Sequence, residues 1–378
     1  MNILHLCFDG NFIQNSIKIF EKYYPKQNKF LMFSKGKNLK FVNPNENLII
    51  CNIKNKKRKQ EVIDSVFESD YDIIILHGIS SHYTDIIDKL GNKKIKVYWI
   101  FWGYELYQTL GYEHNYQLID SQYSIFNKLH YIFPNKLSKI SRKLIRRYIP
   151  DTFNKIIPHI NYFCFWSKYD YNIFKKYFDY PIQYKYFAYS SKENKSLTLP
   201  EPIFSEKKVC STIQINHQAS LFGNHDTVFK RLVELDKDNK LVKLVPLSYG
   251  SKYIKSSVFK LGKKYFDSKF HPIMEYLPKE KYFDLISNVD VAIFGQLRQE
   301  ASGNIIQLLK SGVKIFLRNN NSLLSFYKEK GYHIYSYEDD LNETSLFTPL
   351  TLEEKRHNWN CYINSRVAYE DFMPDLLI

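Results

Sequence analysis

Short apolar runs alternate with amphipathic stretches along this chain, and that alternation limits the possible folds more than any other feature. Ile3–Phe8, Tyr71–Leu76 and Ile95–Trp102 are apolar runs with the length of a strand. The stretches between them have helical spacing, so each run and its successor predict a β-α unit. Repeated β-α units build a mainly parallel sheet covered by helices. The fold class is therefore α/β.

The pattern occurs twice, and 378 residues are enough for two domains with separate cores. Tyr162–Trp166 is predicted as the last strand of the first half. Pro181–Glu206 is polar, contains three prolines and is predicted as a linker. The second half resumes with strands predicted at Lys208–Ile215, Leu241–Leu247, Val289–Phe294 and Val313–Leu317, and a short extended piece at Tyr276–Leu277. We place a first domain at 1–185, a linker at 186–206 and a second domain at 207–348. A helix in the remaining 349–378 is expected to pack back toward the first domain.

The net charge of +15 favours anionic partners, although a Lys-, Asn- and Ile-rich composition produces part of it without selection for a ligand. A nucleic-acid-binding protein is one alternative, but no RNA- or DNA-binding motif occurs. The five cysteines are scattered and show no zinc spacing; Cys7 and Cys164 lie in apolar runs and are predicted to be buried free thiols. The first residues lack the pattern of a secretory signal, and no apolar run is long enough to span a membrane, which favours a cytoplasmic location.

The segment Arg298–Ile315 carries the clearest chemical pattern. It follows a predicted strand, makes a polar turn, begins a helix at Gly303-Asn304 and reaches the next strand through Gly312. A helix N-terminus presents unpaired N–H groups and can hold a diphosphate, to which Arg298 adds a cation. Acceptor atoms for sugar or ribose hydroxyls are offered by Gln299, Glu300 and Gln307. An ordinary β-α-β turn with solvated polar residues explains the same pattern equally well.

This segment resembles the donor-binding element of GT-B glycosyltransferases, in which two glutamates eight residues apart contact sugar and ribose. Gln299 and Gln307 have that spacing here, and Glu300 lies one residue away. The chain also resembles the family that transfers Fuc4NAc from its dTDP-sugar to a lipid-linked disaccharide in enterobacterial common antigen synthesis. The matching pieces are His77-Gly78, Trp99–Tyr107, Asn216 with Asn224-His225, Val245-Pro246 with Tyr249, Arg298-Gln299 with Gly303, and Phe316–Asn319.

The resemblance implies a GT-B fold, two Rossmann-like domains facing each other across a cleft, with acceptor bound by the first domain and nucleotide sugar by the second. It implies a hexosyltransferase that uses a dTDP- or UDP-linked sugar and an acceptor that is lipid-linked or part of a bacterial surface polysaccharide. The implied donor-binding residues are Asn216, Asn224, Tyr249, Gly250, Arg298, Gln299, Glu300, Ser302, Gly303, Asn304 and Gln307. The implied acceptor-binding residues are Gly10, Gly78, Trp102 and Tyr107.

Transfer requires a group that takes a proton from the acceptor hydroxyl. Glu105, His77 and Asp9 follow strands of the first half, so all three are candidates, with Glu105 the first choice. The alternative roles are a carboxylate at a helix N-terminus for Glu105 and a helix cap for Asp9. For His77 they are a histidine hydrogen-bonded to the backbone or one that orients the acceptor. No Asp-x-Asp motif occurs, and neither a metal ion nor another cofactor is expected.

Residues 124–150 are basic and amphipathic, and no acidic residue occurs from Ser121 through Pro150. A basic amphipathic helix can lie on an anionic bilayer. The sequence therefore predicts a peripheral protein on the inner face of the cytoplasmic membrane, while a helix packed on the first domain is the alternative. Two further functions stay open: the same fold with another donor, as in polysaccharide pyruvyl transfer, and a non-catalytic sugar-binding protein.

Overall fold

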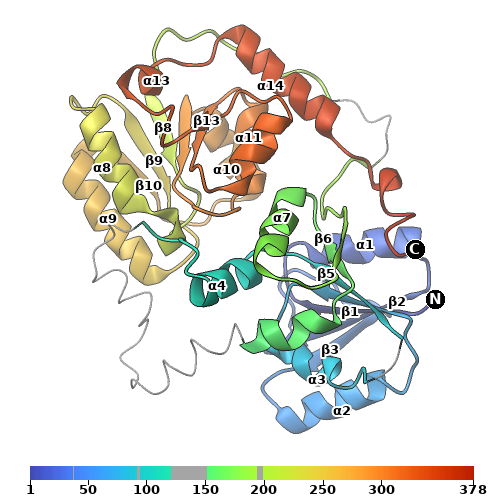
Figure 1. The fold of residues 1–378 in the computed structure, drawn as a ribbon. Helices are drawn as coiled ribbons and strands as arrows, with labels where there is room; N and C mark the ends of the chain where they lie inside the picture. Colours follow the sequence, from blue (N-terminus) through green and yellow to red (C-terminus); the bar gives the residue numbers. More distant parts are fainter. Residues whose placement is uncertain (37, 92–93, 121–150, 194–198) are drawn as a thin grey trace. The chain divides into compact units, whose positions relative to one another are not determined.

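A computed structural model describes residues 1–36, 38–91, 94–120, 151–193 and 199–378 (Figure 1). The predicted membrane segment 124–150 lies outside the described residues. The chain forms two compact units. The first contains Met1–Tyr116, residues 151–193 and Val367–Ile378; the second contains residues 117–120 and 199–366.

The first unit is built on a seven-stranded parallel sheet with the order β3-β2-β1-β4-β5-β6-β7. The strands are β1 (Ile3–Phe8), β2 (Asn28–Ser34), β3 (Leu48–Asn52), β4 (Ile73–His77), β5 (Lys96–Ile100), β6 (Tyr162–Cys164) and β7 (Gln183–Lys185). The helices are α1 (Ile13–Tyr23), α2 (Lys56–Val66), α3 (Thr84–Ile87), α4 (Tyr104–Glu113) and α7 (Lys168–Tyr177). Alternate strand residues such as Ile3 and Cys7 pack with Phe20 of α1 and Met373 of the C-terminal segment in one core.

The second unit has a six-stranded parallel sheet with the order β10-β9-β8-β11-β12-β13. Its strands are β8 (Thr212–Ile215), β9 (Val242–Pro246), β10 (Phe270–Ile273), β11 (Val291–Phe294), β12 (Lys314–Leu317) and β13 (Tyr335–Ser336). Its helices are α8 (His225–Leu235), α9 (Lys252–Phe266), α10 (Lys279–Ser287), α11 (Ser302–Lys310), α12 (Ser322–Glu329), α13 (Glu343–Phe347) and α14 (Leu352–Ser365). This strand order is that of a Rossmann fold.

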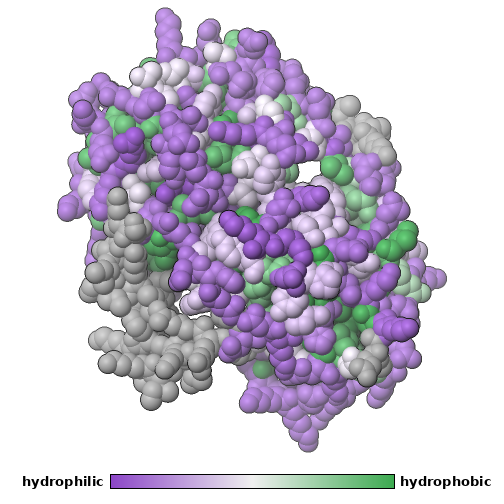
Figure 2. Space-filling view, viewed as in Figure 1, coloured by the Kyte–Doolittle hydropathy of each residue, from purple (hydrophilic) through white to green (hydrophobic). Residues whose placement is uncertain are grey.

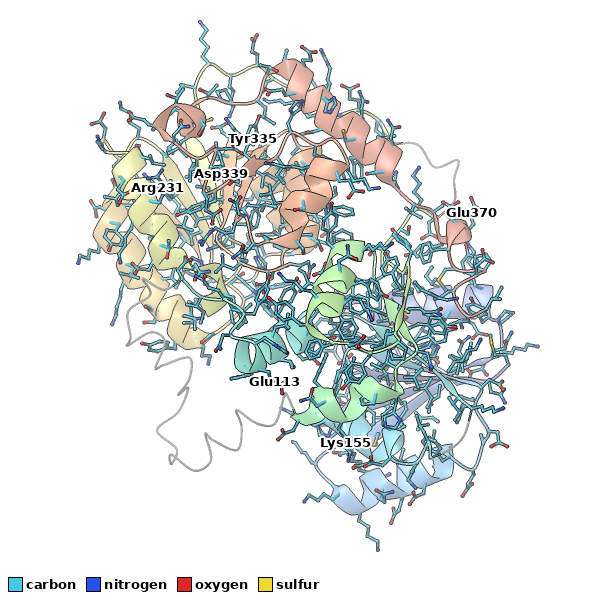
Figure 3. The ribbon with its side chains drawn as sticks, in the orientation of Figure 1. Glu113, Lys155, Arg231, Tyr335, Asp339 and Glu370 are labelled. Atoms are coloured by element: carbon cyan, nitrogen blue, oxygen red, sulfur yellow. The ribbon has the colours of Figure 1, made fainter. Side chains whose placement is uncertain are left out.

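Side chains fill the space between the helices and strands of each unit (Figure 3), and the face shown in Figure 2 is mostly hydrophilic with small apolar patches. Lys155, labelled in Figure 3, pairs with Asp88 at 2.6 Å on the surface of the first unit. Cys7 and Cys164 are buried free thiols, which confirms the prediction for both.

Three predictions about the elements differ from the structure. Tyr162–Trp166 does not contain the last strand of the first half, because β7 follows at Gln183–Lys185 inside the segment predicted as a linker. This strand is short, polar and at the sheet edge, so it has no apolar pattern. Its continuation also belongs to the first unit, since Phe187 and Ala188 lie in that core.

The extended piece expected at Tyr276–Leu277 is instead β10, at Phe270–Ile273. β10 contains Pro272, which argues against a strand in a sequence but is tolerated at the edge of a sheet. The helix predicted in 349–378 is α14, which belongs to the second unit and packs on α11. Only Val367–Ile378 joins the first unit, where Tyr369 and Met373 are buried.

Candidate functional site

Open parallel sheets bind ligands at the carboxyl ends of their strands, where the strand order reverses. That point lies between β1 and β4 in the first unit and between β8 and β11 in the second. The segments that leave these strands begin at Asp9 and Gly78, and at Asn216 and Gly295.

A pocket of about 780 Å³ lies at this edge of the second unit, between the segments that follow β8 and β9. It is lined by Gln218, Ala219, Ser220, Leu221, Phe222, Ser248, Tyr249, Gly250, Ser251, Tyr253 and Ile254. None of these lining residues is charged. Tyr249 is 74% exposed and Tyr253 is 36% exposed. Exposed rings beside an uncharged lining suit a flat, largely apolar group such as a nucleobase rather than a phosphate.

Gly250 fixes the shape of this pocket. Its φ is +108°, and it forms a β-bridge with Ala219. A Cβ atom on Gly250 would lie 2.3 Å from the Ala219 carbonyl oxygen. Glycine is therefore required here by both the backbone angle and the close approach. The predicted donor residues Tyr249 and Gly250 both line the pocket.

Asn216 and Asn224, two further predicted donor residues, hold the backbone together at the strand-order reversal. Both have left-handed φ values and are fully buried. The Asn216 Oδ1 atom accepts from the Gly295 N–H at 2.8 Å, and its Nδ2 donates to the Gly223 carbonyl at 2.9 Å. Asn224 Nδ2 donates to the Gly295 carbonyl at 2.9 Å. Both side chains therefore fix the backbone at these strand ends and are not exposed to a ligand.

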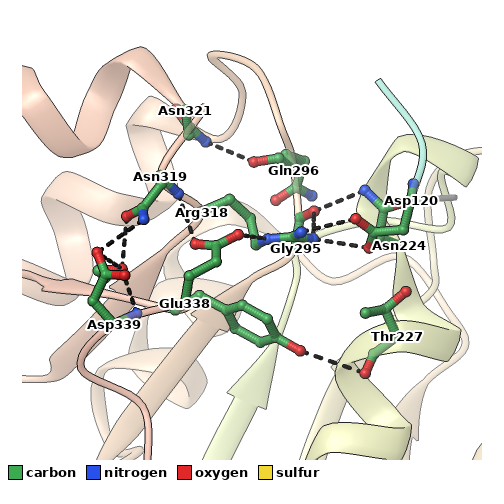
Figure 4. A network of polar contacts seen from close by, with 12 residues as sticks. Asp120, Asn224, Thr227, Gly295, Gln296, Arg318, Asn319, Asn321, Glu338 and Asp339 are labelled. Atoms are coloured by element: carbon green, nitrogen blue, oxygen red, sulfur yellow. Dashed lines mark hydrogen bonds and ion pairs between the residues drawn. The ribbon is translucent and has the colours of Figure 1, made fainter. Parts of the chain in front are cut away.

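A buried network of ion pairs also stabilises the backbone where the strand order reverses (Figure 4). Arg318, which follows β12, binds the Asp120 carboxylate through both terminal nitrogens at 2.9 and 2.8 Å. Its Nε atom donates to Glu338, and one terminal nitrogen reaches the Gly295 carbonyl at 3.4 Å. The Asp120 N–H in turn donates to Asn224 Oδ1 at 3.0 Å. The network thus ties residue 120 to the backbone at the end of β11.

Arg298 and Glu300, two of the predicted donor-binding residues, lie together beside the pocket. Their side chains form an ion pair of 3.4 Å and are 10% and 14% exposed. The Arg298 guanidinium lies over the Phe222 ring at 5.1 Å, and Gln218 Nε2 donates to Glu300 Oε1 at 2.6 Å. Phe222 and Gln218 line the pocket, so they connect it to this charged pair. Sequence reasoning missed both, because they lie within a loop that has no recognisable motif.

Two buried acceptor atoms near this pair have no hydrogen-bond partner among the described residues. They are the second carboxylate oxygen of Glu300, Oε2, and the amide oxygen of Gln296, Oε1. Gln296 is fully buried, and its amide nitrogen lies 3.5 Å from His217 Nδ1. A buried acceptor left unpaired is costly, so each atom requires a donor. A hydroxyl group supplies such a donor, whereas an ionised phosphate does not.

The N-terminus of α11 is open. Ala301 precedes it with a left-handed φ of +67°, and no side chain caps the helix. A Cβ atom on Gly303 would meet nothing within 4 Å, and Ser302 is the first residue of the helix. Asn304 is held by the Tyr282 hydroxyl, which donates to its Oδ1 at 2.7 Å. The uncapped N–H groups and the helix dipole favour an anion here.

The two glutamines with the spacing of the glutamate pair differ from Glu300. Gln307 Nε2 donates to Ser287 on α10 at 3.0 Å, so this side chain links two helices. Gln299 is 9% exposed. Of the three alternatives, Glu300 has both a contact with a pocket residue and an unpaired acceptor atom.

In the first unit, Asp9 organises a loop. Its carboxylate accepts backbone N–H bonds from Lys40 (2.5 Å), Phe41 (3.0 Å) and Val42 (3.2 Å). The alternative role predicted for Asp9, a cap of the first helix, is wrong, because the N-cap of α1 is Phe12 and makes no side-chain cap bond. Neighbouring Gly10 lies beside the Trp102 ring.

Glu105 is 1% exposed and lies in the first turn of α4, where its charge complements the helix dipole. Its Oε1 atom accepts from the Trp99 indole N–H at 2.9 Å and from the Trp102 backbone N–H at 3.1 Å. The carboxylate therefore holds the backbone at the end of β5. Tyr107 is fully buried, and its hydroxyl donates to Asp170 at 2.7 Å, so it does not face a ligand.

His77 is 2% exposed, and both of its ring nitrogens are engaged. Nε2 lies 3.1 Å from His5 Nδ1, and Nδ1 lies 2.7 Å from the Tyr189 hydroxyl. The backbone-bonded histidine of the alternative interpretation is therefore not observed. Burial lowers the pKa of His77 well below its ordinary value, and His5 lowers it further. Tyr189 was missed, because it lies in the segment predicted as a linker.

No three His, Cys, Asp or Glu side chains come together as a metal-ligand set in the described part of the chain. Near the predicted donor site, Asp226 pairs with Lys230 at 2.9 Å. Within the same described residues, no helix has the length and apolar character needed to cross a membrane.

The sequence matches no known protein-family model and no curated protein. The structure, in contrast, is similar to many solved ones. Sucrose-phosphate synthase from Thermosynechococcus elongatus superposes with a TM-score of 0.59 at 9% identity, over 98% of this chain and 96% of that one. The trehalose-6-phosphate synthase OtsA gives 0.56 at 8% identity, over 100% and 99%. WaaG, a glycosyltransferase involved in lipopolysaccharide biosynthesis, gives 0.55 at 11% identity, over 99% and 98%.

At these identities the likeness shows the fold alone. Because it spans nearly the whole of each chain and includes two Rossmann-like units, the protein has the GT-B fold, as its sequence predicts.

Proposed function

We propose that this protein is a glycosyltransferase that takes its sugar from a nucleotide donor bound to the second unit. The observation that carries the proposal is the pair of buried, unpartnered acceptors, Glu300 Oε2 and Gln296 Oε1, beside the cation of Arg298. Hydroxyl groups of a ligand can donate to the two acceptors, while Arg298 and the uncapped N-terminus of α11 favour an anion. A sugar nucleotide presents both chemistries in one molecule.

The uncharged pocket supplies the third part of the proposed site. Its lining of Tyr249, Tyr253 and Phe222 suits the base, and Phe222 also contacts Arg298. In this arrangement the base enters the pocket, the diphosphate lies toward Arg298 and the helix, and sugar or ribose hydroxyls reach Glu300. Structures with the same fold include a trehalose-6-phosphate synthase and a glycosyltransferase of lipopolysaccharide biosynthesis, which supports glycosyl transfer as the reaction.

A thermal-shift titration with dTDP, UDP, GDP and ADP tests this proposal. A ligand at 100 times its dissociation constant stabilises the folded state by about 2.7 kcal/mol, so binding is easily detected. We expect dTDP or UDP to raise the melting temperature of the wild-type protein but not of Gly250→Ala, whose Cβ displaces the Ala219 carbonyl. Gly36→Ala, where the added atom meets nothing within 4 Å, is the matched control. If none of the four nucleotides stabilises the wild-type protein, the proposal is wrong.

We further propose a dTDP-linked acetamido- or dideoxyhexose as the donor sugar and a lipid-linked or surface-polysaccharide acceptor. These proposals rest on the sequence resemblance. Contact with the inner face of the cytoplasmic membrane through residues 124–150 is proposed from the charge of that segment alone. Flotation with vesicles containing anionic phosphatidylglycerol tests it: binding at low salt is expected, and recovery of all protein at the bottom of the gradient would refute it.

A further inference from the structure

Five polar side chains of the first unit form a continuous hydrogen-bonded series, here called the indole network: Trp102, Tyr189, His77, His5 and Asn28. The Trp102 indole N–H donates to the Tyr189 hydroxyl at 2.8 Å, and this hydroxyl lies 2.7 Å from His77 Nδ1. His77 Nε2 lies 3.1 Å from His5 Nδ1, and His5 Nε2 lies 3.1 Å from Asn28 Oδ1. The series runs from the interior of the unit to the carboxyl edge of its sheet.

The direction of every bond in the indole network is determined by its two ends. Asn28 Nδ2 donates to the Tyr24 carbonyl at 2.6 Å, so Asn28 Oδ1 accepts and His5 Nε2 carries the proton. His5 Nδ1 is then an acceptor, which places the proton of His77 on Nε2. His77 Nδ1 consequently accepts from Tyr189, whose oxygen accepts from Trp102. Each group donates once in the same direction, from Trp102 to Asn28.

The indole network is uncharged and is a poor destination for a proton. Burial lowers the pKa of His5 to about 3, although its bond to Asn28 raises it slightly, and burial also lowers that of His77. Protonation of either ring would turn an acceptor nitrogen into a donor and break a bond of the series. The two histidines therefore hold an orientation and do not serve as a base.

The orientation held is that of the Trp102 ring. Cβ atoms built on Gly10 and Gly78 would lie 3.6 and 3.5 Å from it, so the half-buried indole borders both strand ends at the reversal of strand order. Phe12, 52% exposed, stacks on Tyr189 with ring centroids 5.2 Å apart. The Trp102 backbone is fixed separately by Glu105. Trp102 packs against the core of the unit but is partly exposed, and with Phe12 it leaves aromatic surface in contact with solvent beside a rigid polar network, which suits ligand binding.

We propose that Tyr189 is a positioning residue that, through the indole network, holds the Trp102 ring as a stacking surface for a sugar ring of the acceptor. The apolar C–H face of a saccharide fits an indole face, and its rim hydroxyls remain available to solvent and to neighbouring polar groups. This inference rests on the proposed glycosyl transfer for the identity of its ligand as acceptor.

The test uses Tyr189→Phe, which removes the hydroxyl and keeps the ring. Tyr184→Phe is the matched control: it lies five residues earlier and loses a hydroxyl that donates to the Phe165 carbonyl at 2.7 Å, outside the indole network. Binding of N,N′-diacetylchitobiose is followed by the indole N–H signals of ¹⁵N-labelled protein. The chain has four tryptophans, and Trp102→Phe identifies the signal of Trp102. Imidazole ¹⁵N shifts give the tautomers of His5 and His77.

We expect both histidines to be neutral Nε2–H tautomers at pH 7, and chitobiose to shift the Trp102 signal. Tyr189→Phe should move the Trp102 signal and weaken chitobiose about tenfold, a factor that corresponds to about 1.4 kcal/mol, whereas Tyr184→Phe should bind like wild type. An Nδ1–H tautomer of His77, no chitobiose-dependent shift in wild type, or equal binding by Tyr189→Phe would each overturn the inference. A dTDP titration of the same samples reports on the donor site, so failure of the proposed function is recognised separately.

Discussion

Replacement of Asp120 by asparagine should destabilise the second unit strongly, although only one atom type changes. Asp120 and Arg318 are each 9% exposed and are joined by two charge-assisted hydrogen bonds of 2.9 and 2.8 Å. Burial lowers the pKa of Arg318, but Asp120 and Glu338 outweigh that effect and hold it above its ordinary value. An asparagine keeps one acceptor oxygen but directs an N–H₂ group toward the N–H groups of the guanidinium. Arg318 is then left with Glu338 and the Gly295 carbonyl.

Loss of one partner of a buried ion pair costs about 3–5 kcal/mol. Because Glu338 continues to neutralise Arg318, we expect the lower value, about 3 kcal/mol. For a unit of this size about 1 kcal/mol lowers the melting temperature by about 2–4 °C, so the expected decrease is about 6–12 °C. Binding of dTDP at the proposed donor site should weaken as well, since the Asp120 N–H also holds the side chain of Asn224.

Differential scanning calorimetry measures this change, with Asp238→Asn as the matched control. Asp238 makes a 2.7 Å pair with Lys240, but the two side chains are 71% and 68% exposed, so water and salt screen this pair and it contributes little to stability. The control should therefore melt within about 2 °C of wild type. Equal melting of Asp120→Asn and Asp238→Asn would show that the buried geometry of Figure 4 does not stabilise the unit.

Three further changes test the sites. Arg298→Ala should weaken dTDP about tenfold or more and thymidine much less, because its cation is assigned to the diphosphate; calorimetric titration checks this, and Arg231→Ala, an exposed cation of α8, is the control. Glu105→Gln should keep turnover within about threefold, since its carboxylate is buried against indole and backbone N–H groups; a loss of about 10²–10⁴-fold in kcat with intact folding would restore it as the general base. Asp290→Asn should destabilise the second unit at pH 7 and progressively less toward pH 3. Burial raises the pKa of Asp290, but Lys207, the Ser211 N–H and the Thr212 hydroxyl lower it more. The stability that Asp290 contributes is therefore present above an ordinary carboxyl pKa of about 4 and is lost as the pH falls. A pH-independent difference in unfolding midpoint would contradict that assignment.

The fold could be predicted because the strands that decide it are the buried ones. β1 begins and ends where the apolar pattern places it, at Ile3–Phe8, because its residues are buried in the core of the first unit. The edge strands β7 and β10 could not be predicted, because one face of each sheet edge is solvated and tolerates Gln183 or Pro272. The same physical difference explains the misplaced end of the first domain.

Parts of the site were predictable for a different reason. Arg298, Glu300 and the start of α11 are consecutive in sequence, so a local pattern places them at one strand end. Gln218 and Tyr189 come from other segments and reach the sites only through tertiary structure. Sequence reasoning also assigned chemistry to buried residues: Glu105 and His77 follow strands, as expected, but strand ends hold structural carboxylates and imidazoles as well as catalytic ones.

In both units, the hydrogen-bond partners of the buried polar residues distinguish those that fix the backbone from those that remain available for a ligand. The side chains of Asn216, Asn224 and Glu105 are hydrogen-bonded to backbone groups at strand ends. The segments that follow these strand ends carry the residues that remain available for a ligand. In the second unit Glu300 Oε2 and Gln296 Oε1 are buried acceptors without a hydrogen-bond partner among the described residues, as is Gln214 Oε1, and the proposed function assigns ligand hydroxyl groups to the first two. An unpaired buried acceptor costs about 1–3 kcal/mol, so a ligand hydroxyl group that donates to Glu300 Oε2 or Gln296 Oε1 would contribute to binding. Because Glu300 Oε1 pairs with Arg298 and accepts from Gln218, Glu300→Leu should destabilise the unliganded protein more than Glu300→Gln, which keeps one acceptor oxygen. Both variants should weaken donor binding in calorimetric titration, and a Glu300→Gln variant that binds the donor like wild type would contradict the role proposed for Oε2.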